Sequence, residues 1–322
     1  MKSLELAKSI CACAEVGLAL KDKNHPCHKV VMTQQEMIQG DESVRQRPEP
    51  WIGNLENSKV LFISSNPSIS DDPDISIRED FPTYGTPEDD SAEFFVNRFN
   101  RKDGAPHATF NYEGHADFLY RSNDGKYRGK GNSFDKPIET WQGVYERAKE
   151  ILGESCDPAV NYALTEVVKC KSKAEVGVKK ASSNCIDQWM HKVMQISPAN
   201  LVVVIGAPAR DIFAHKLADL GSEFGADSKG YQKLGQRGRA LRDIKISDFG
   251  GKSRIYMFNW HPTSMIPNKS ELLQFKNAYG PGLVEWMNQI ANGTVEIPAS
   301  QESLESIIKD KTKEALTLRN GE

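Results

Sequence analysis

Four short apolar runs constrain the fold of this chain more than any other feature of its sequence. They lie at residues 59–65 (KVLFISS), 160–168 (VNYALTEVV), 200–205 (NLVVVI) and 254–259 (RIYMFN). Continuous runs of this length, rich in Val, Ile and Phe, are typical of strands that are buried on both faces of a parallel sheet.

Helical patterns separate these runs, at residues 138–152, 186–196 and 208–220. The last pattern begins with Pro208, and proline is favoured in the first turn of a helix. Strands that alternate with helices predict an α/β protein with a parallel sheet. We therefore expect a three-layer α/β/α arrangement around a central four-stranded parallel sheet.

The 322 residues predict one large domain over residues 1–297. A long insertion, at about 70–135, follows the first strand and is acidic first and aromatic afterwards. Residues 298–322 form a polar and charged tail, in which 303–316 either forms a peripheral helix or has no fixed structure.

Composition restricts the class of protein. The formal net charge of −3 and the sequence pI of about 6.2 mean that any nucleic-acid site must be a local basic patch. Mean hydropathy is −0.54, and no apolar run approaches the ~18 residues of a membrane helix. Residues 1–20 mix charged and apolar positions, which predicts an amphipathic helix rather than a signal peptide. We expect a cytoplasmic monomer without a membrane partner.

Polar residues follow all four predicted strands. The runs lead into Asn66, Glu166, Gly206 and His261 respectively. Because the carboxyl ends of parallel strands meet at one edge of a sheet, an amide, a carboxylate and a histidine should converge on one pocket there.

These strand ends resemble the uracil-DNA glycosylase superfamily, most closely its iron–sulfur (family 4-like) branch. Members carry a Gly-x-Asn-Pro-Gly loop, a Thr-Asn-x-Val-Lys-Cys strand end and a late His-Pro-Ser loop. This chain has Ser-Ser-Asn-Pro-Ser at 64–68, Thr-Glu-Val-Val-Lys-Cys at 165–170 and His-Pro-Thr at 261–263, in the same order. The similarity is strongest over 184–213 and covers roughly 60–68 and 160–267.

The resemblance implies a DNA glycosylase that flips an altered base into a pocket and hydrolyses its N-glycosidic bond. His261 would donate a hydrogen bond to the base as negative charge develops on it, and Asn66 would hold the attacking water. Tyr84 or Phe81 would stack on the flipped base. Read from the residues alone, Asn66 before a proline is also an ordinary turn former, and Tyr84 an ordinary structural residue.

Glu166 departs from the family pattern, which has an asparagine that reads uracil at this position. An ionised carboxylate only accepts hydrogen bonds, so it suits the exocyclic amine of a cytosine-type base better than the O4 atom of uracil. A protonated carboxyl could donate instead, and a buried ion pair with Lys169 is a structural alternative. We therefore expect a modified cytosine-type base, with defence against modified foreign DNA or DNA repair as the setting.

Six cysteines lie in a chain expected to be in a reducing compartment. Cys170 and Cys185 match the second pair of cluster ligands in the iron–sulfur branch, whereas the branch's N-terminal Cys-x2-Cys is missing. The resemblance implies a [4Fe–4S] cluster on Cys13, Cys27, Cys170 and Cys185, with Cys11 able to replace Cys13. Tetrahedral zinc, or no metal at all with buried cysteines, is the alternative.

Basic residues supply two candidate DNA contacts. Residues 229–245 alternate Lys and Arg with glycine, which predicts a loop that follows phosphates, and 126–130 form a second basic stretch. The named candidates are Lys233, Arg237, Arg239, Thr263 and Ser264. A solvated charged face explains the same pattern.

Two other classes remain open. One is a catalytically silent iron–sulfur module that binds nucleic acid, and the other is an α/β hydrolase of small nucleotides. A conventional uracil-DNA glycosylase is the alternative within the family. The pairing of Asn66 with His261 argues against the silent module, and the lack of a Gly-rich phosphate loop or nucleophile elbow argues against common hydrolases.

Overall fold

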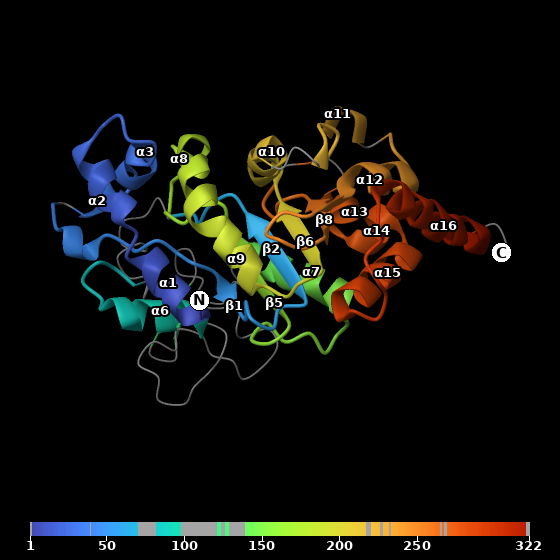
Figure 1. Cartoon of the computed structure of the whole chain (residues 1–322), viewed down its shortest axis with the longest axis horizontal. Coiled ribbons are helices and arrows are strands. Elements are labelled where there is room, and N and C mark those ends of the chain that lie inside the picture. Colours follow the sequence, from blue (N-terminus) through green and yellow to red (C-terminus); the bar gives the residue numbers. More distant parts are fainter. Residues whose placement is uncertain are drawn as a thin grey trace.

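The computed structural model has a six-stranded sheet at its centre (Figure 1). It describes residues 2–38, 40–69, 82–97, 121–123, 126–128, 139–216, 220–225, 228–231, 233–264, 266 and 269–319. The strands lie in the order β1-β5-β2-β6-β8-β7. Their bounds are β1 Ile52–Gly53, β2 Val60–Ser64, β5 Tyr162–Glu166, β6 Leu201–Ile205, β7 Ile244–Ser247 and β8 Arg254–Asn259.

Strands β5, β2, β6 and β8 are mutually parallel and coincide with the four apolar runs. The α/β class is therefore confirmed. The expectation of a purely parallel four-stranded sheet is wrong, because β1 and β7 add antiparallel strands at the two edges.

Neither edge strand can be recognised from its sequence. Strand β1 has only two residues, too few for an alternating pattern to show. Gly53 has φ +88, and a Cβ there would lie 2.6 Å from the Tyr162 carbonyl oxygen, so close strand pairing requires glycine. Strand β7 begins in the last two residues of the segment 229–245, for which the sequence predicts a basic loop.

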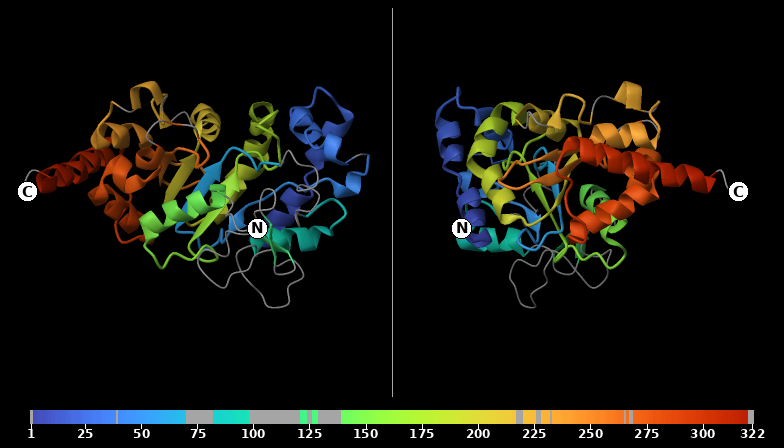
Figure 2. Two further views of the ribbon diagram at one scale, coloured as in Figure 1. Left: turned by 180° about the vertical axis from the view of Figure 1, so that it is seen from behind. Right: turned by 45° about the vertical axis from the view of Figure 1, so that its right-hand side comes forward.

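Alternation along the strands divides the core into two layers. Leu61 and Ile63 of β2 pack on one face with the N-terminal helices, among others, and Val60 and Phe62 pack on the other face. The first face is covered by α1 Ser3–Cys11, α2 Ala14–Lys21, α3 His28–Met32, α8 Val178–Cys185, the π-helical turn η3 Ile186–Met190, α9 His191–Ile196 and α10 Ala207–Lys216. The second is covered by α7 Glu139–Leu152, α12 Gln236–Asp243, α14 Phe275–Tyr279, α15 Pro281–Asn292 and α16 Gln301–Arg319. In both views of Figure 2, the N-terminal helices and the C-terminal helices lie on opposite sides of the sheet.

Short elements complete the described part of the chain. They are α4 Gln35–Ile38, the 3₁₀ turn η1 Glu42–Val44, α6 Glu88–Val96, the hairpin β3 Arg121–Asn123 and β4 Lys126–Arg128, α11 Ser228–Tyr231 and α13 Lys269–Leu273. Within the predicted insertion, α6 packs against α1. Much of 70–135 lies outside the described residues.

Three segments outside the central strands need comment. For two of them the expectation changes, and for the third the structure decides between two alternatives. The single helix expected over 1–20 is two helices that break at Ala12 and Cys13. The basic segment 229–245 is mostly α11 and α12 rather than a loop. The C-terminal tail is helical, and Leu304 and Ile308 of α16 are buried in the second layer, which explains why this polar segment is ordered. Among the described residues, none of the helices combines the length and apolar character needed to cross a membrane.

Candidate functional site

The structure brings the candidate residues to one edge of the sheet. In the strand order β5-β2-β6-β8, the ends carry Glu166, Asn66 two residues past β2, Gly206 and His261 respectively. The loops that follow β2 and β5 run side by side beyond the sheet. The Val167 and Val168 N–H groups donate to the Ser64 and Ser65 carbonyls, and Ser172 N–H donates to the Pro67 carbonyl at 3.0 Å. The Asn66 loop is thereby fixed to the segment that carries Cys170.

His261 is held in a defined tautomer. Its Nδ1 atom lies 2.8 Å from the Thr263 hydroxyl and accepts from the Thr263 N–H at 3.3 Å. A backbone N–H can only donate, so Nδ1 carries no proton and the neutral ring has its proton on Nε2. Burial lowers the pKa of His261, and the positive charge of Lys269 lowers it further. The site therefore holds a neutral imidazole with Nε2–H as its donor.

Two glycines shape the loop that carries His261. Gly206 has φ +84, and a Cβ there would lie 3.2 Å from His261 Cβ. Gly143 of α7 contacts the same loop from the other layer, because a Cβ there would lie 2.4 Å from Pro262 Cγ. The His-Pro loop is thus held between the end of β6 and α7, with no room for a larger residue at position 143.

Asn66 is half-buried, and its Nδ2 donates to the Pro67 carbonyl at 2.7 Å. The hydroxyl of the preceding residue, buried Ser65, donates to Glu175 Oε1 at 2.5 Å. Glu175 and its neighbour Ala174 have φ values of +60 and +47, in the left-handed region that is costly for residues with a Cβ. The structure thus concentrates backbone strain beside the Asn66 loop, and nothing in the sequence signalled Glu175.

Glu166 is buried at the end of β5, in register with Ser64 of β2. Lys169 lies close enough for its charge to interact with Glu166, and its Nζ donates to the Pro50 carbonyl and to Thr165 Oγ1. Burial lowers the pKa of Lys169, and Glu166 opposes that shift. Lys169 is therefore an electrostatic partner of Glu166, which agrees with the structural alternative of a buried ion pair.

Four cysteines line a pocket in the first layer, the cysteine pocket. Cys13, Cys27, Cys170 and Cys185 come from the start of α2, the start of α3, the loop after β5 and the end of α8. The two other cysteines lie elsewhere. Cys11 packs with Phe94 and Phe95, and Cys156 lies in the other layer. The pocket thus contains the four cysteines named from the sequence, with Cys13 rather than Cys11.

Groups that can donate hydrogen bonds lie near these thiols and oppose the rise in pKa that burial causes. They are the Glu15 and Val16 N–H groups and the Trp189 side chain at Cys13, Asn184 at Cys27 and the Lys169 N–H at Cys185. Trp189 lies in the π-helical turn that begins immediately after Cys185. Such turns often mark functional positions, but the sequence pattern here predicts only an ordinary helix.

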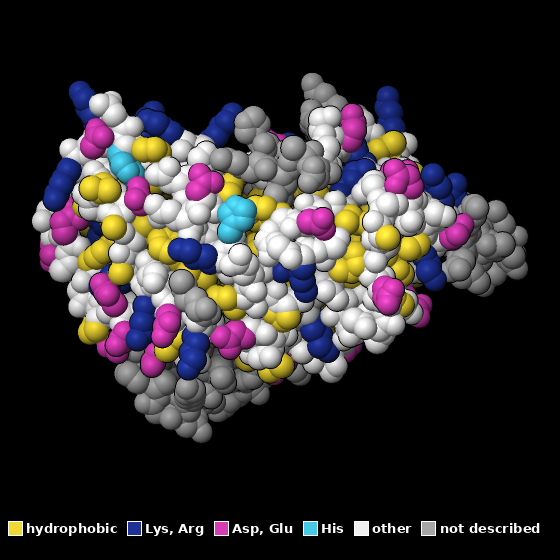
Figure 3. All heavy atoms as spheres, viewed as in Figure 1, with side chains coloured by type: hydrophobic (Ala, Val, Ile, Leu, Met, Phe, Trp, Pro, Cys, Tyr) yellow, Lys and Arg dark blue, Asp and Glu magenta, His cyan; other side chains and the backbone are white. Residues whose placement is uncertain are grey.

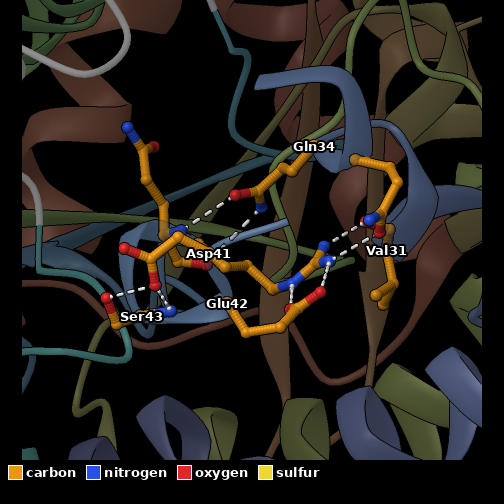
Figure 4. Close-up of polar contacts among 8 residues, drawn as sticks. Val31, Gln34, Asp41, Glu42 and Ser43 are labelled. Carbon is orange, nitrogen blue, oxygen red and sulfur yellow. Dashed lines mark hydrogen bonds and ion pairs between the residues drawn. The ribbon is translucent and has the colours of Figure 1, made fainter. Parts of the chain in front are cut away.

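Four buried cationic side chains lie in this part of the chain, and one of them, Lys169, lines the same pocket. Arg45, Arg47, Lys169 and Lys171 are each at most 5 % exposed. The Arg45 guanidinium donates to the Val31 carbonyl at 2.6 Å and to Glu42 Oε2 at 2.7 Å (Figure 4). The positive charges of Arg45 and Lys169 act on Cys170 and Cys185 respectively. Sequence reasoning missed these four side chains because Lys and Arg are normally exposed.

Tyr84 packs against the buried cluster that contains Cys13, Cys27 and Cys185, and its charge interactions are with Cys170, Cys13, Arg47 and Arg45. The stacking role that the resemblance implies for Tyr84 stays a prediction. Phe81, the other stacking candidate, lies outside the described residues.

The candidate DNA contacts differ in exposure. Lys233 and Thr263 are exposed and Ser264 is half-buried. Arg237 donates to Thr312 at 3.2 Å, and buried Arg239 donates to Glu271 at 2.9 Å and lies over the Tyr231 ring. Arg239 therefore has structural contacts that compete with a phosphate. On the face seen in Figure 3, basic side chains are scattered among acidic ones.

Comparison with known proteins assigns no family to this arrangement. No protein-family model matches the chain, and a search of curated proteins finds no match to its sequence.

Proposed function

We propose that the protein is a DNA glycosylase that hydrolyses the N-glycosidic bond of a flipped-out base. The observation that carries this proposal is the neutral His261, which Thr263 fixes with its proton on Nε2, at the strand edge that also holds Asn66 and Glu166.

The chemistry follows from where charge develops. When the bond between the sugar C1′ and the base nitrogen breaks, the electron pair leaves with the base and the sugar becomes oxocarbenium-like. Negative charge spreads to the O2 atom of a pyrimidine. A fixed Nε2–H donor to that oxygen stabilises the leaving base without reorganisation, and such donors contribute about 3–4 kcal/mol in other enzymes.

Asn66 holds the attacking water in this proposal. Because its Nδ2 is bonded to the Pro67 carbonyl, Oδ1 is the atom that accepts a hydrogen bond from water. The water oxygen adds to C1′, one of its protons passes to solvent, and the base anion takes up a proton as it leaves. An amide is a weak base, which suffices when the sugar cation is the stronger electrophile.

Glu166 selects the base. An ionised carboxylate accepts from the exocyclic amine of a cytosine-type ring and repels the O4 atom of uracil. Since excision of ordinary cytosine would damage the genome, the substrate in this proposal is a modified cytosine. Defence against modified foreign DNA is the setting that fits such a substrate.

The four cysteines fit an iron–sulfur cluster in their donor set and surroundings. A cluster on four thiolates is anionic, and the buried Arg45 and Lys169 supply the compensating charge. Among the described residues, no group of three or more Cys, His, Asp or Glu side chains is already arranged to hold a metal ion, so the metal content of the purified protein tests this part of the proposal. The cluster would be structural and join the N-terminal helices to the sheet.

The test is base release, measured by mass spectrometry. DNAs that contain uracil, 5-hydroxymethylcytosine or glucosylated hydroxymethylcytosine are incubated with wild type, Glu166→Asn and His261→Gln. We expect wild type to release a cytosine-derived base and Glu166→Asn to shift toward uracil. His261→Gln should lose on the order of 10²–10³-fold in rate while it still binds DNA.

Glu305→Gln is the matched control, because Glu305 lies on α16 in a surface pair with Lys309. It should release the same base at the wild-type rate. Uracil release by wild type would overturn the role given to Glu166. If His261→Gln retained the full rate, or if wild type released none of these bases, the glycosylase proposal would be wrong.

A further inference from the structure

Tyr84 has a buried hydroxyl that meets no hydrogen-bond partner among the described residues. Both its backbone and its ring are held by neighbouring residues. The Tyr84 N–H donates to the Arg45 carbonyl at 2.8 Å, and the Arg47 guanidinium carbon lies 4.7 Å from the ring centre. A buried hydroxyl without a partner costs about 1–3 kcal/mol, so its retention in a fixed position needs an explanation.

The packing around Tyr84 places it in the same part of the core as the cysteines. Tyr84 and Cys170 both pack against the buried cluster that contains Cys13, Cys27 and Cys185. In keeping with this position, Cys170 and then Cys13 are, after burial, the largest influences that raise the pKa of Tyr84. A tyrosine hydroxyl is protonated at neutral pH and can donate, and cysteine sulfurs are acceptors in this part of the core.

Arg47 is itself fixed in place, which makes the ring position reproducible. Its guanidinium donates to the Cys11 carbonyl at 3.1 Å and to the Thr86 carbonyl at 3.0 Å. Arg47 thus links α1, the loop before α6 and the Tyr84 ring.

We infer that the Tyr84 hydroxyl donates a hydrogen bond to a sulfur of an iron–sulfur cluster on Cys13, Cys27, Cys170 and Cys185, and that Arg47 positions the ring for it. This inference rests on the proposed cluster and not on the glycosylase activity. It makes Tyr84 a residue that tunes the cluster rather than one that stacks on the base.

The consequence is a shift in reduction potential. An O–H···S bond withdraws electron density from the sulfur and stabilises the reduced cluster, which carries one more negative charge. Without the hydroxyl, adding that electron is harder, and the midpoint potential becomes more negative. The fold of the site should be unaffected, since phenylalanine preserves the ring and its contact with Arg47.

The experiment compares wild type with Tyr84→Phe, both purified without oxygen. Iron and acid-labile sulfide are counted first, and the midpoint potential is then measured by titration with dithionite as the electron donor. We expect equal iron contents and a more negative potential in Tyr84→Phe. Incorporation of 3-fluorotyrosine at position 84, a stronger donor, should move the potential in the positive direction.

Tyr145→Phe is the matched control. Tyr145 is also buried beside a cysteine, Cys156, but that pair lies in the other layer. Its removal should leave the potential unchanged. Equal potentials in wild type, Tyr84→Phe and the fluorotyrosine protein would overturn the inference. Wild type that contains zinc or no metal would overturn it as well, whereas loss of base release in a protein with an intact cluster would bear only on the glycosylase proposal.

Discussion

At the scale of single residues, the protonation state of His261 is set by its contacts rather than by its type. The Thr263 N–H requires an unprotonated Nδ1, and burial with the nearby Lys269 keeps the pKa of the ring below its usual value. Protonation would put two N–H groups against each other and displace the ring. The neutral form is therefore the active form in the proposed mechanism.

Replacement of Lys269 should move the acid side of the pH profile. Because Lys269 lowers the pKa of His261, Lys269→Gln raises it, and protonation begins at a higher pH. Wild type should lose base-release rate only below about pH 6.5, the ordinary histidine value. The variant should lose rate at a higher pH than wild type does. Single-turnover rates at saturating protein measure this without interference from DNA affinity.

Lys309→Gln, on the distant α16, controls for the loss of one positive charge. It should have the wild-type profile. An acid limb in Lys269→Gln that coincides with the wild-type limb would show that His261 does not set it.

At the scale of elements, the site depends on a helix from one layer that contacts a loop from the sheet. Gly143 of α7 lies against Pro262, next to His261. Glycine is unfavourable inside a helix by up to about 1 kcal/mol relative to alanine, so helix propensity alone predicts that alanine would stabilise α7. Close contact with the loop explains why glycine stands there.

Gly143→Ala should therefore be destabilising and should reduce base release. A Cβ would lie 2.4 Å from Pro262 Cγ, which forces the proline and the adjoining histidine to move. Overpacking of this kind costs about 1–3 kcal/mol. Urea unfolding and single-turnover rates measure the two effects.

Gly17→Ala is the matched control, because Gly17 lies inside α2 with open space around its Cα. It should stabilise the protein by up to about 1 kcal/mol and leave the rate unchanged. Stabilisation by Gly143→Ala with full activity would contradict the role given to the contact with Pro262.

At the scale of the whole molecule, the cysteine pocket joins two parts of the chain that are distant in sequence. Cys13 and Cys27 begin α2 and α3, whereas Cys170 and Cys185 belong to the sheet loop and α8. A metal group on all four would be a cross-link between the N-terminal helices and the core. Figure 1 shows α2 and α3 at one end of the molecule, beside α8.

Cys170→Ser should lower the iron content and loosen the N-terminal helices. Hydrogen exchange, followed by mass spectrometry, should speed up in residues 2–38 and much less in β6 and β8. Cys156→Ser is the matched control, since Cys156 is buried in the opposite layer. It should keep its iron and its protection. Full iron content in Cys170→Ser would contradict the assignment of this cysteine as a ligand.

The sequence by itself determined the four parallel strands, most of the helices between them and the residues at the strand ends. Buried strands have local signatures, and parallel order brings their ends together, so the apolar runs alone place Asn66, Glu166 and His261 at one edge of the sheet. The four cysteines that line the cysteine pocket are those that the family resemblance names. Their spacing in the sequence alone does not single them out. Their binding of a metal, like the glycosylase activity, is a prediction that the experiments above test.

Only the tertiary structure decided the rest, because those features depend on contacts between distant segments. The two-residue β1 is a strand only because β5 lies beside it, and Arg239 is buried only because Glu271 and Tyr231 surround it. The family resemblance names Tyr84 or Phe81 as the residue that stacks on the base, which stays a prediction, whereas only the structure shows that Arg47, from an earlier segment of the chain, lies over the Tyr84 ring. Local periodicity contains no information about such pairings, since they are fixed by how the layers pack and not by any one segment.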